Sequence, residues 1–367
     1  MNKKIAVLGL LLLSFCMARA HEKGNENRQW FYGIQGHITH ITAHHPDLKP
    51  FSGGLSPALE LNVGFRTLGL HKWEHHYNFP SMGIGYYRSQ PGQRQVLGKV
   101  NSAFLFLEFN TRERKNYETF FKYSLGLAHF SNPHHPDTNP ENQAIATPFN
   151  VHFNANYTFA YRLSPQIKLA SGVSFTHFSN GAYKKPNKGL NILDVNLGIR
   201  HFPGEPRQRH ATPEFGKSMQ QWPSYRLHAM YSVGKMQKVI EPDQYMAHCL
   251  TVEFARQSHY TNRWGVGLNV FYDDFLKAQA REEFEANSFK NYLHGAVHIL
   301  HDVVFHRLWA TFQLGYYAFY YVEPYKPIFQ RVGLRYQFDN GIMTGVSLKT
   351  HYTRADVVEW GVGYRIL

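Results

Sequence analysis

The sequence is poor in cysteine and has no long hydrophobic segment beyond its first residues. It contains 2 cysteines, Cys16 and Cys249, and only Cys249 lies outside the N-terminal leader described below. No disulfide can therefore form within the mature chain. No run of about 20 apolar residues follows the leader, which excludes transmembrane helices. The chain must obtain its stability from side-chain burial or from a membrane that it crosses with strands.

The first residues have the features of a secretory signal peptide, which we place at 1–20. Two lysines precede an apolar run over 5–15, and Ala18-Arg19-Ala20 supplies a small-residue cleavage site before His21. We therefore expect an exported protein.

Acidic residues are fewer than basic ones, 26 against 39, so the net charge is +13, or +10 without the three basic residues of the leader. A basic protein suits an anionic partner. Because nucleic acid is not expected as the partner of an exported protein, phosphorylated lipid is the better candidate. The alternative is that the charges only solvate loops.

The mature chain is rich in aromatic residues and in runs where apolar and polar residues alternate. Aromatic residues make up 16% of the sequence, as expected where aromatic girdles mark two membrane interfaces. Alternating apolar and polar residues predict strands in two series. The first is near 30–42, 56–66, 81–88, 95–109, 117–129, 149–162, 166–179 and 190–202. The second is near 224–236, 247–257, 262–274, 291–302, 307–321, 327–338, 341–353 and 356–367, with one helical segment near 277–286.

Long polar connections alternate with short ones, which is typical of an all-β, antiparallel up-and-down outer-membrane barrel. The two series resemble each other, for example at 172–178 and 345–352, and indicate a duplicated eight-strand unit. We expect a first unit over 21–204, a connection over 205–223, and a degenerate second unit over 224–367. One transmembrane β-barrel of about 14–16 strands in one ring is favoured because it removes every sheet edge; the alternative is two tandem eight-stranded barrels.

Candidate catalytic residues lie at the end of the seventh predicted strand. His177 and Ser179 are two apart on an extended segment and share one face, so they are candidates for a base and a nucleophile. If the following strand pairs around the turn so that residue numbers sum to about 368, Asn191 faces His177. Apolar residues such as Val173 and Leu193 share this face, which meets lipid in a membrane barrel.

The seventh strand of such a barrel ends near the external rim if the N-terminus is periplasmic. The three residues would then lie at the height of the outer leaflet of the outer membrane. The lipid there is lipopolysaccharide, whose lipid A carries ester-linked acyl chains and phosphates. The sequence therefore indicates a lipid-processing site.

The segment 175–202 resembles the catalytic hairpin of the PagL-type lipid A 3-O-deacylases, eight-stranded outer-membrane barrels with a serine hydrolase site. The detailed resemblance covers about 30 residues and rests on two motifs, His-Phe-Ser-Asn-Gly from His177 and Pro-Asn-Lys-Gly from Pro186. It implies that His177 is the general base and Ser179 the nucleophile, with Asn180 as an oxyanion donor. Pro186, Asn187 and Gly189 would shape the loop.

The sequence departs from the family at Asn191, where a glutamate is expected. An asparagine can accept the histidine N–H and fix the tautomer of the ring, but it cannot stabilise the imidazolium by charge. The nearest acid, Asp194, alternates to the opposite face of the strand.

Two functions fit these observations. The first is an outer-membrane serine esterase that removes an ester-linked acyl chain from lipid A of lipopolysaccharide without a cofactor. The second is a non-catalytic barrel, a porin or a scaffold, with a relic of the site. The residues that could contact lipid A phosphates are Lys184, Lys185 and Lys188.

Other motifs carry weaker hypotheses. His129-Phe130-Ser131-Asn132 repeats the letters of the first motif but lacks the turn that follows it, so we interpret it as a loop entry. Histidine-rich patches include His44, but adjacent histidines on a strand point to opposite faces, so no metal site is expected. The sequence leaves the oligomeric state and the acyl position open.

Overall fold

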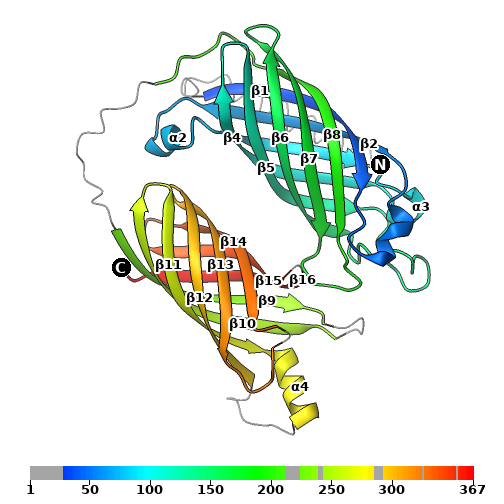
Figure 1. Cartoon of the computed structure of the whole chain (residues 1–367), viewed down its shortest axis with the longest axis vertical. Helices are drawn as coiled ribbons and strands as arrows, with labels where there is room; N and C mark the ends of the chain where they lie inside the picture. Colours follow the sequence, from blue (N-terminus) through cyan, green and yellow to red (C-terminus); the bar gives the residue numbers. More distant parts are fainter. Residues whose placement is uncertain (1–27, 211–223, 239–242, 285–291, 325, 353) are drawn as a thin grey trace.

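A computed structural model of the chain describes residues 28–210, 224–238, 243–284, 292–324, 326–352 and 354–367. These residues form two closed antiparallel barrels, β1–β8 and β9–β16, shown side by side in Figure 1. Within each barrel every strand pairs with its neighbours in sequence. Each ring closes where its first strand pairs with its last.

The strands of the first barrel are β1 (Arg28–Ile41), β2 (Ser56–Thr67), β3 (Ser81–Ser89), β4 (Val100–Glu113), β5 (Tyr117–Phe130), β6 (Phe149–Arg162), β7 (Ile167–Ser179) and β8 (Leu190–His201). The second barrel consists of β9 (Ser224–Met236), β10 (Tyr245–His259), β11 (Asn262–Asp273), β12 (Leu293–Phe305), β13 (Leu308–Phe319), β14 (Ile328–Gln337), β15 (Ile342–His351) and β16 (Arg354–Arg365). The helices are η1 (Pro46–Phe51), α2 (Lys72–His76), α3 (Arg94–Leu97) and α4 (Asp274–Phe284).

All the predicted strands are present, and the prediction of two tandem barrels is confirmed. The favoured single ring is wrong, because β8 pairs with β1 and leaves no edge for β9. The second series closes on itself instead of completing a larger barrel. The strand predicted from residue 95 begins at Val100, after α3, and the predicted helical segment corresponds to α4. The predicted signal peptide and residues 211–223 lie outside the described residues. Within the described part of the chain, no helix is long and apolar enough to span a membrane.

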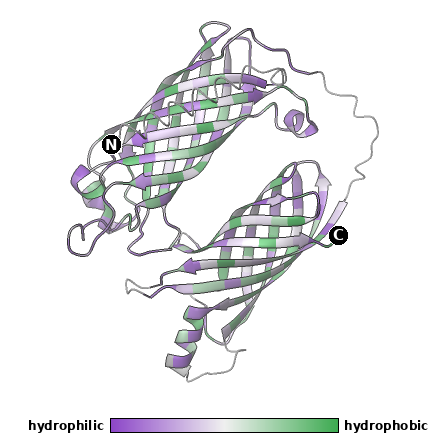
Figure 2. Cartoon of the chain, turned by 180° about the vertical axis from the view of Figure 1, so that it is seen from behind, coloured by the Kyte–Doolittle hydropathy of each residue, from purple (hydrophilic) through white to green (hydrophobic). Residues whose placement is uncertain are grey.

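Hydrophobic and hydrophilic residues alternate along the strands, as the colours of Figure 2 show. The apolar side chains face outward and the polar ones are buried in the lumen. On β7, Leu169 and Val173 point outward and Val173 is 58% exposed, whereas Lys168 and Ser174 are buried in the lumen. Apolar side chains that remain exposed around a closed ring are those that face lipid in a membrane barrel.

Buried ion pairs fill the lumen of the first barrel. The Arg200 guanidinium donates to both carboxylate oxygens of Glu108, at 2.8 and 2.5 Å. Lys122, which pairs across the strands with Glu108, donates to one carboxylate oxygen of Glu60. Charges buried in a low dielectric must be paired, and these pairs occupy the space that a channel would need.

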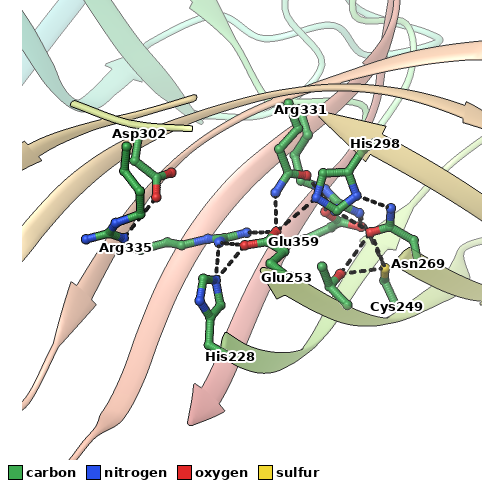
Figure 3. A network of polar contacts seen from close by, with 12 residues as sticks. His228, Cys249, Glu253, Asn269, His298, Asp302, Arg331, Arg335 and Glu359 are labelled. Carbon is green, nitrogen blue, oxygen red and sulfur yellow. Dashed lines mark hydrogen bonds and ion pairs between the residues drawn. The ribbon is translucent and has the colours of Figure 1, made fainter. Parts of the chain in front are cut away.

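The lumen of the second barrel holds a larger polar network (Figure 3). Glu253 lies at its centre and is fully buried. It accepts hydrogen bonds from Arg335 at 2.5 and 3.0 Å and also contacts His228 at 2.5 Å. Arg331 pairs with Glu359 at 2.7 Å nearby. The second barrel is therefore also packed by side chains.

The two barrels contact each other at both rims. We call the rim at which odd-numbered strands end the external rim, following the predicted orientation, and the opposite one the periplasmic rim. At the periplasmic rim the Tyr77 hydroxyl donates to the Val304 carbonyl at 2.8 Å, and the Tyr77 ring packs on Phe305. At the external rim the Gln237 N–H donates to the Ala182 carbonyl at 2.9 Å. Because like rims meet, both barrels run through the membrane in the same sense.

Candidate active site

Strands β7 and β8 place the candidate catalytic residues on one face of the first barrel. His177 pairs with Asn191, which confirms the predicted register. His177, Ser179 and Asn191 are half-buried and share the outward face with Val173 and the apolar residues of β8. His177 Nδ1 lies 2.6 Å from Asn191 Oδ1. These side chains point outward from the barrel near the rim at which odd-numbered strands end, as their parity predicts.

The loop between β7 and β8 packs against the His177 ring. Gly189 has φ +75°, and a Cβ there would lie 2.8 Å from His177 Cε1, so a larger residue would displace the ring. Its N–H donates to the Ala144 carbonyl at 3.0 Å. Asn187 accepts a hydrogen bond from the Asn180 N–H at 3.3 Å, which fixes the first residue after β7.

A third residue, His44, orients the asparagine. The Lys188 carbonyl can only accept, so His44 Nε2, 2.9 Å away, donates to it. His44 Nδ1 therefore accepts from the Asn191 amide nitrogen at 3.0 Å, which turns Asn191 Oδ1 toward His177. His177 Nδ1 then carries the proton, and Nε2 is left as the basic nitrogen.

The contact of His44 with Asn191 was not predicted from the sequence, in which His44 belongs to a histidine-rich patch. His44 lies 147 positions from Asn191 in sequence, and no local motif links the two. Among the residues that the structure describes, no group of three or more His, Cys, Asp or Glu side chains is arranged to hold a metal ion.

Ser179 and Asn180 are not part of the hydrogen-bonded pair that His177 forms with Asn191. None of the hydrogen bonds of the described residues joins the Ser179 hydroxyl to His177. The Asn180 side chain is engaged inside the loop, where its amide nitrogen donates to the Lys184 carbonyl at 2.8 Å. Asn180 is only 8% exposed. The site thus holds a formed His177–Asn191 pair with the serine on the same face.

Asp194 cannot replace the missing carboxylate, as predicted from its parity. Its side chain is in the lumen, where it accepts from Ser174 at 2.5 Å and contacts His37 Nδ1 at 2.9 Å. The repeated motif near residue 131 braces an external loop. There the Ser131 hydroxyl accepts from the Lys99 N–H at 2.8 Å, away from any pairing with a histidine.

The three lysines of the loop have different environments. Lys188 Nζ lies 3.6 Å from an Asp47 carboxylate oxygen, and Lys184 is exposed. Lys185 Nζ donates to the Lys238 carbonyl of the second barrel. Burial, together with the neighbouring positive charges of Arg354, Lys238 and Lys188, lowers the pKa of Lys185 to about 8.

Among the described residues of the second barrel, none repeats the site at the corresponding positions of β15 and β16. The sequence of β15 aligns with that of β7 when Gly345 and Ser347 are matched to the glycine and serine of the first run. In this alignment Thr350 and Tyr352 fall at the outward positions of His177 and Ser179. His351 therefore lies one residue beyond the position that corresponds to His177. Because strand side chains alternate, His351 points into the lumen, where its Nε2 lies 3.3 Å from the Tyr317 hydroxyl.

Closed barrels with an apolar exterior and a packed polar lumen define an outer-membrane β-barrel protein, here with a polar histidine–asparagine pair exposed on the lipid-facing side. Two family models match the sequence. The model described as "Lipid A 3-O-deacylase (PagL)" matches residues 58–200, and the model described as "Acyloxyacyl hydrolase, C-terminal domain" matches residues 225–367. Together they cover most of the chain, which belongs to the PagL lipid A 3-O-deacylase family and is a hydrolase of the outer membrane.

Solved structures with similar folds have low sequence identity. Neisserial surface protein A is 10% identical, with a TM-score of 0.35, and the match covers 48% of this chain and 99% of that one. OccAB4 of Acinetobacter baumannii is 8% identical, with a TM-score of 0.24 and coverage of 92% and 98%. The toluene transporter TodX of Pseudomonas putida is 8% identical, with a TM-score of 0.18 and coverage of 93% and 89%. No curated protein matches the sequence.

Proposed function

We propose that this protein is an outer-membrane serine esterase that removes the ester-linked acyl chain at the 3-position of lipid A. Family membership supports the substrate and the reaction. The observation that carries the mechanism is the His177–Asn191 pair, with 2.6 Å between Nδ1 and Oδ1, on the lipid-facing side beside Ser179. An acyl chain in the outer leaflet reaches this face without leaving the bilayer.

The reaction proceeds in two steps. The Ser179 hydroxyl oxygen attacks the ester carbonyl while His177 Nε2 takes its proton, and a C–O bond forms to give a tetrahedral oxyanion. The intermediate collapses when the bond to the sugar oxygen breaks, and His177 returns the proton to that oxygen. Water, deprotonated by the same nitrogen, then attacks the acyl-Ser179 ester. The bond between the acyl carbon and the Ser179 oxygen breaks, His177 returns the proton to that oxygen, and the fatty acid is released.

Asn191 keeps His177 in the tautomer that this mechanism needs. The orientation of Asn191 in turn depends on His44, through the hydrogen bond of 3.0 Å between them. What the asparagine lacks is the negative charge that would stabilise the imidazolium formed in each step. In a soluble serine hydrolase, loss of that charge together with the wrong tautomer costs about four orders of magnitude. Here the tautomer is retained, so we expect a slow but competent enzyme.

The oxyanion requires hydrogen-bond donors near Ser179. The Asn180 amide nitrogen has two N–H groups. One donates to the Lys184 carbonyl at 2.8 Å and the other to Thr147 Oγ1 at 3.4 Å, and the second becomes an oxyanion donor when the longer bond is given up. The neighbouring Gly181 N–H has no hydrogen-bond partner among the described residues, and we propose it as a second donor. One oriented donor of this kind contributes about 3 kcal/mol to transition-state stability.

The lysines of the loop are the candidates for contact with the phosphates of lipid A. Lys184 is the strongest candidate for phosphate contact, because it is exposed at the external rim. Lys188 is partly neutralised by Asp47 at 3.6 Å. Lys185 contributes charge from the contact between the barrels. The alternative, a porin or an inert scaffold, is not favoured because ion pairs fill both lumens.

The proposal is tested by mass spectrometry of lipid A from cells that lack the protein, express it, or express Ser179→Ala. We expect loss of one ester-linked acyl chain only with the native protein. Ser131→Ala is the matched control, since this serine belongs to the repeated motif and should leave deacylation intact. Deacylation by Ser179→Ala at the native level would overturn the proposal.

A further inference from the structure

We propose that the second barrel is a positioning module for the active-site loop of the first, and that Gln237 is its principal positioning residue. This inference rests on the proposed function, since the loop in question begins directly after Ser179. It assigns a role to a barrel that has lost the histidine, serine and asparagine of the first.

The loop and the second barrel are joined by hydrogen bonds to the loop backbone. The Gln237 N–H donates to the Ala182 carbonyl at 2.9 Å, and its side-chain Oε1 accepts from the Lys185 N–H at 2.8 Å. The Gln244 amide donates to the Tyr183 carbonyl at 3.2 Å. Gln237 is 5% exposed, so water does not substitute for these bonds. Contacts with backbone groups specify a loop conformation, whereas side-chain packing alone would specify only proximity.

The same segment has a backbone conformation that needs support. Gly181 and Ala182 have φ values of +63° and +70°, and Ala182 bears a Cβ in this left-handed region. Such residues persist where the surroundings hold them. Gly181 packs so closely on the second barrel that a Cβ would overlap the Val358 side chain. The second barrel therefore both holds and shapes the two residues that follow Asn180.

The loop is divided between the two barrels. Its second half belongs to the first barrel, because the N–H groups of Lys188 and Gly189 donate to the carbonyls of Gln143 and Ala144 at 3.1 and 3.0 Å. Its first half, 181–185, is held by the second barrel. Only the first half connects directly to Ser179 and to the proposed oxyanion donors.

Association of the barrels does not itself require these bonds. At the periplasmic rim Tyr77 already joins them, through its hydrogen bond to the Val304 carbonyl and its ring contact with Phe305. Loss of the Gln237 side chain removes the bond to the Lys185 N–H, while the backbone bond to Ala182 and the Gln244 bond to Tyr183 remain. It should thus leave the barrels together and loosen the first half of the loop. This separates positioning from assembly.

Trypsin provides a test that does not depend on activity. The loop has two cleavable bonds, after Lys184 and after Lys188, whereas the bond after Lys185 precedes proline and resists trypsin. In the folded full chain in detergent micelles, Gln237→Ala should speed cleavage after Lys184 about five- to tenfold, the change expected for one lost hydrogen bond. Cleavage after Lys188 should not change.

Kinetics with purified lipid A provide the second readout. Gln237→Ala should lower kcat about five- to tenfold with little change in KM, because it disturbs transition-state donors and not the lipid-facing surface. Gln237→Glu retains an acceptor for the Lys185 N–H and should recover most of kcat. Gln337→Ala, which removes a glutamine at the periplasmic rim of the same barrel, should match the native protein.

The outcomes distinguish the two proposals. Native rates of cleavage after Lys184 and native kcat in Gln237→Ala would overturn the positioning role, while an inactive Ser179→Ala would still support the esterase. If Ser179→Ala remained active, the esterase proposal would fail whatever the loop did. A loss in Gln237→Ala that Gln237→Glu does not recover would also overturn the assignment to this hydrogen bond.

Discussion

The two barrels have the same number and order of strands, yet among the described residues only the first has a histidine–asparagine pair on the outward face at its external rim. In the second barrel the outward contact between His301 and Asn262, at 3.1 Å, lies at the periplasmic rim. At the outward positions of β7 and β8 the first barrel has His177 and Asn191, which pair directly across the hairpin. The second has Thr350 opposite Ala355. His351, next to Thr350, points into the lumen. The comparison shows that one residue of displacement on a strand separates a lipid-facing group from a buried one.

The barrels also use their external rims differently. In the first barrel the loop after β7 folds back over the outward face and covers the His177 ring with Gly189. In the second, Gln237 and Gln244 reach from the segments around β9 and β10 to that loop. In the proposed function, the first barrel holds the reacting residues and the second supports the loop beside them.

Substitution of the histidine should give the largest contrast between the copies. His177→Ala removes the base and should lower the rate of lipid A deacylation at least about 10³-fold. Thr350→Ala, the same position in the second barrel, should change the rate less than about twofold. Initial rates of fatty-acid release by the two purified variants measure this contrast. Equal losses in both would show that the second barrel takes part in the chemistry.

The missing charge at position 191 provides the next test. Asn191→Asp places a carboxylate where Oδ1 now accepts from His177, and it should raise kcat about tenfold or more because it stabilises the imidazolium. Asn191→Ala should lower kcat instead. The measurement is kcat on lipid A at pH 7, and an aspartate variant slower than the native enzyme would contradict this account of Asn191.

The orienting role of His44 is tested in two backgrounds, the native protein and Asn191→Asp. His44→Ala should lower kcat about fivefold in the native protein, because the Asn191 amide is then free to turn its nitrogen toward His177. A carboxylate has two equivalent oxygens and needs no such orientation. The effect of His44→Ala should therefore be smaller when residue 191 is aspartate, and equal effects in both backgrounds would argue against the hydrogen-bond chain.

The contact between Gly181 and Val358 provides a test across the barrels. Gly181→Ala should lower kcat about three- to fivefold, from the left-handed backbone and the overlap with Val358 together. Val358→Ala alone should have little effect, and in the double variant it should restore part of the loss by removing the overlapping methyl group. Strictly additive effects in this cycle would show that the two side chains do not meet.

The smallest expected effect is on pH dependence. Because the pKa of Lys185 is lowered to about 8, its ammonium is charged below that pH and becomes neutral above it. The apparent affinity for phosphorylated lipid A should thus weaken about twofold between pH 7 and 9. Lys185→Arg stays charged and should flatten the profile. A dephosphorylated substrate serves as the control, since it should show no such change with either protein.

Much of the first barrel could be predicted from the sequence, because strand alternation is a local signal. The parity of His177 and Ser179 and the pairing of His177 with Asn191 follow from two short runs and a turn. Closure could not be predicted in this way. Alternation does not encode that β1 pairs with β8, so one ring and two rings fit the same pattern.

The contacts that complete the site are long-range and escape sequence analysis for the same reason. His44 reaches Asn191 across 147 positions, and Lys185 reaches Gln237 across 52 positions and a change of barrel. The sequence also gives no sign that the Asn180 amide turns back to the Lys184 carbonyl. Each of these depends on how loops pack at the rim, which neither composition nor periodicity specifies.

The most direct test of the central claim is the site at which a serine-directed phosphonate ester labels the folded protein. Digestion with trypsin after Lys168 and Lys184 releases the segment 169–184, which contains Ser179. We predict that the label is on Ser179 in this segment, that its attachment abolishes lipid A deacylation, and that His177→Ala prevents it. An active enzyme that is labelled elsewhere, or that retains full activity when Ser179 is labelled, would contradict the account.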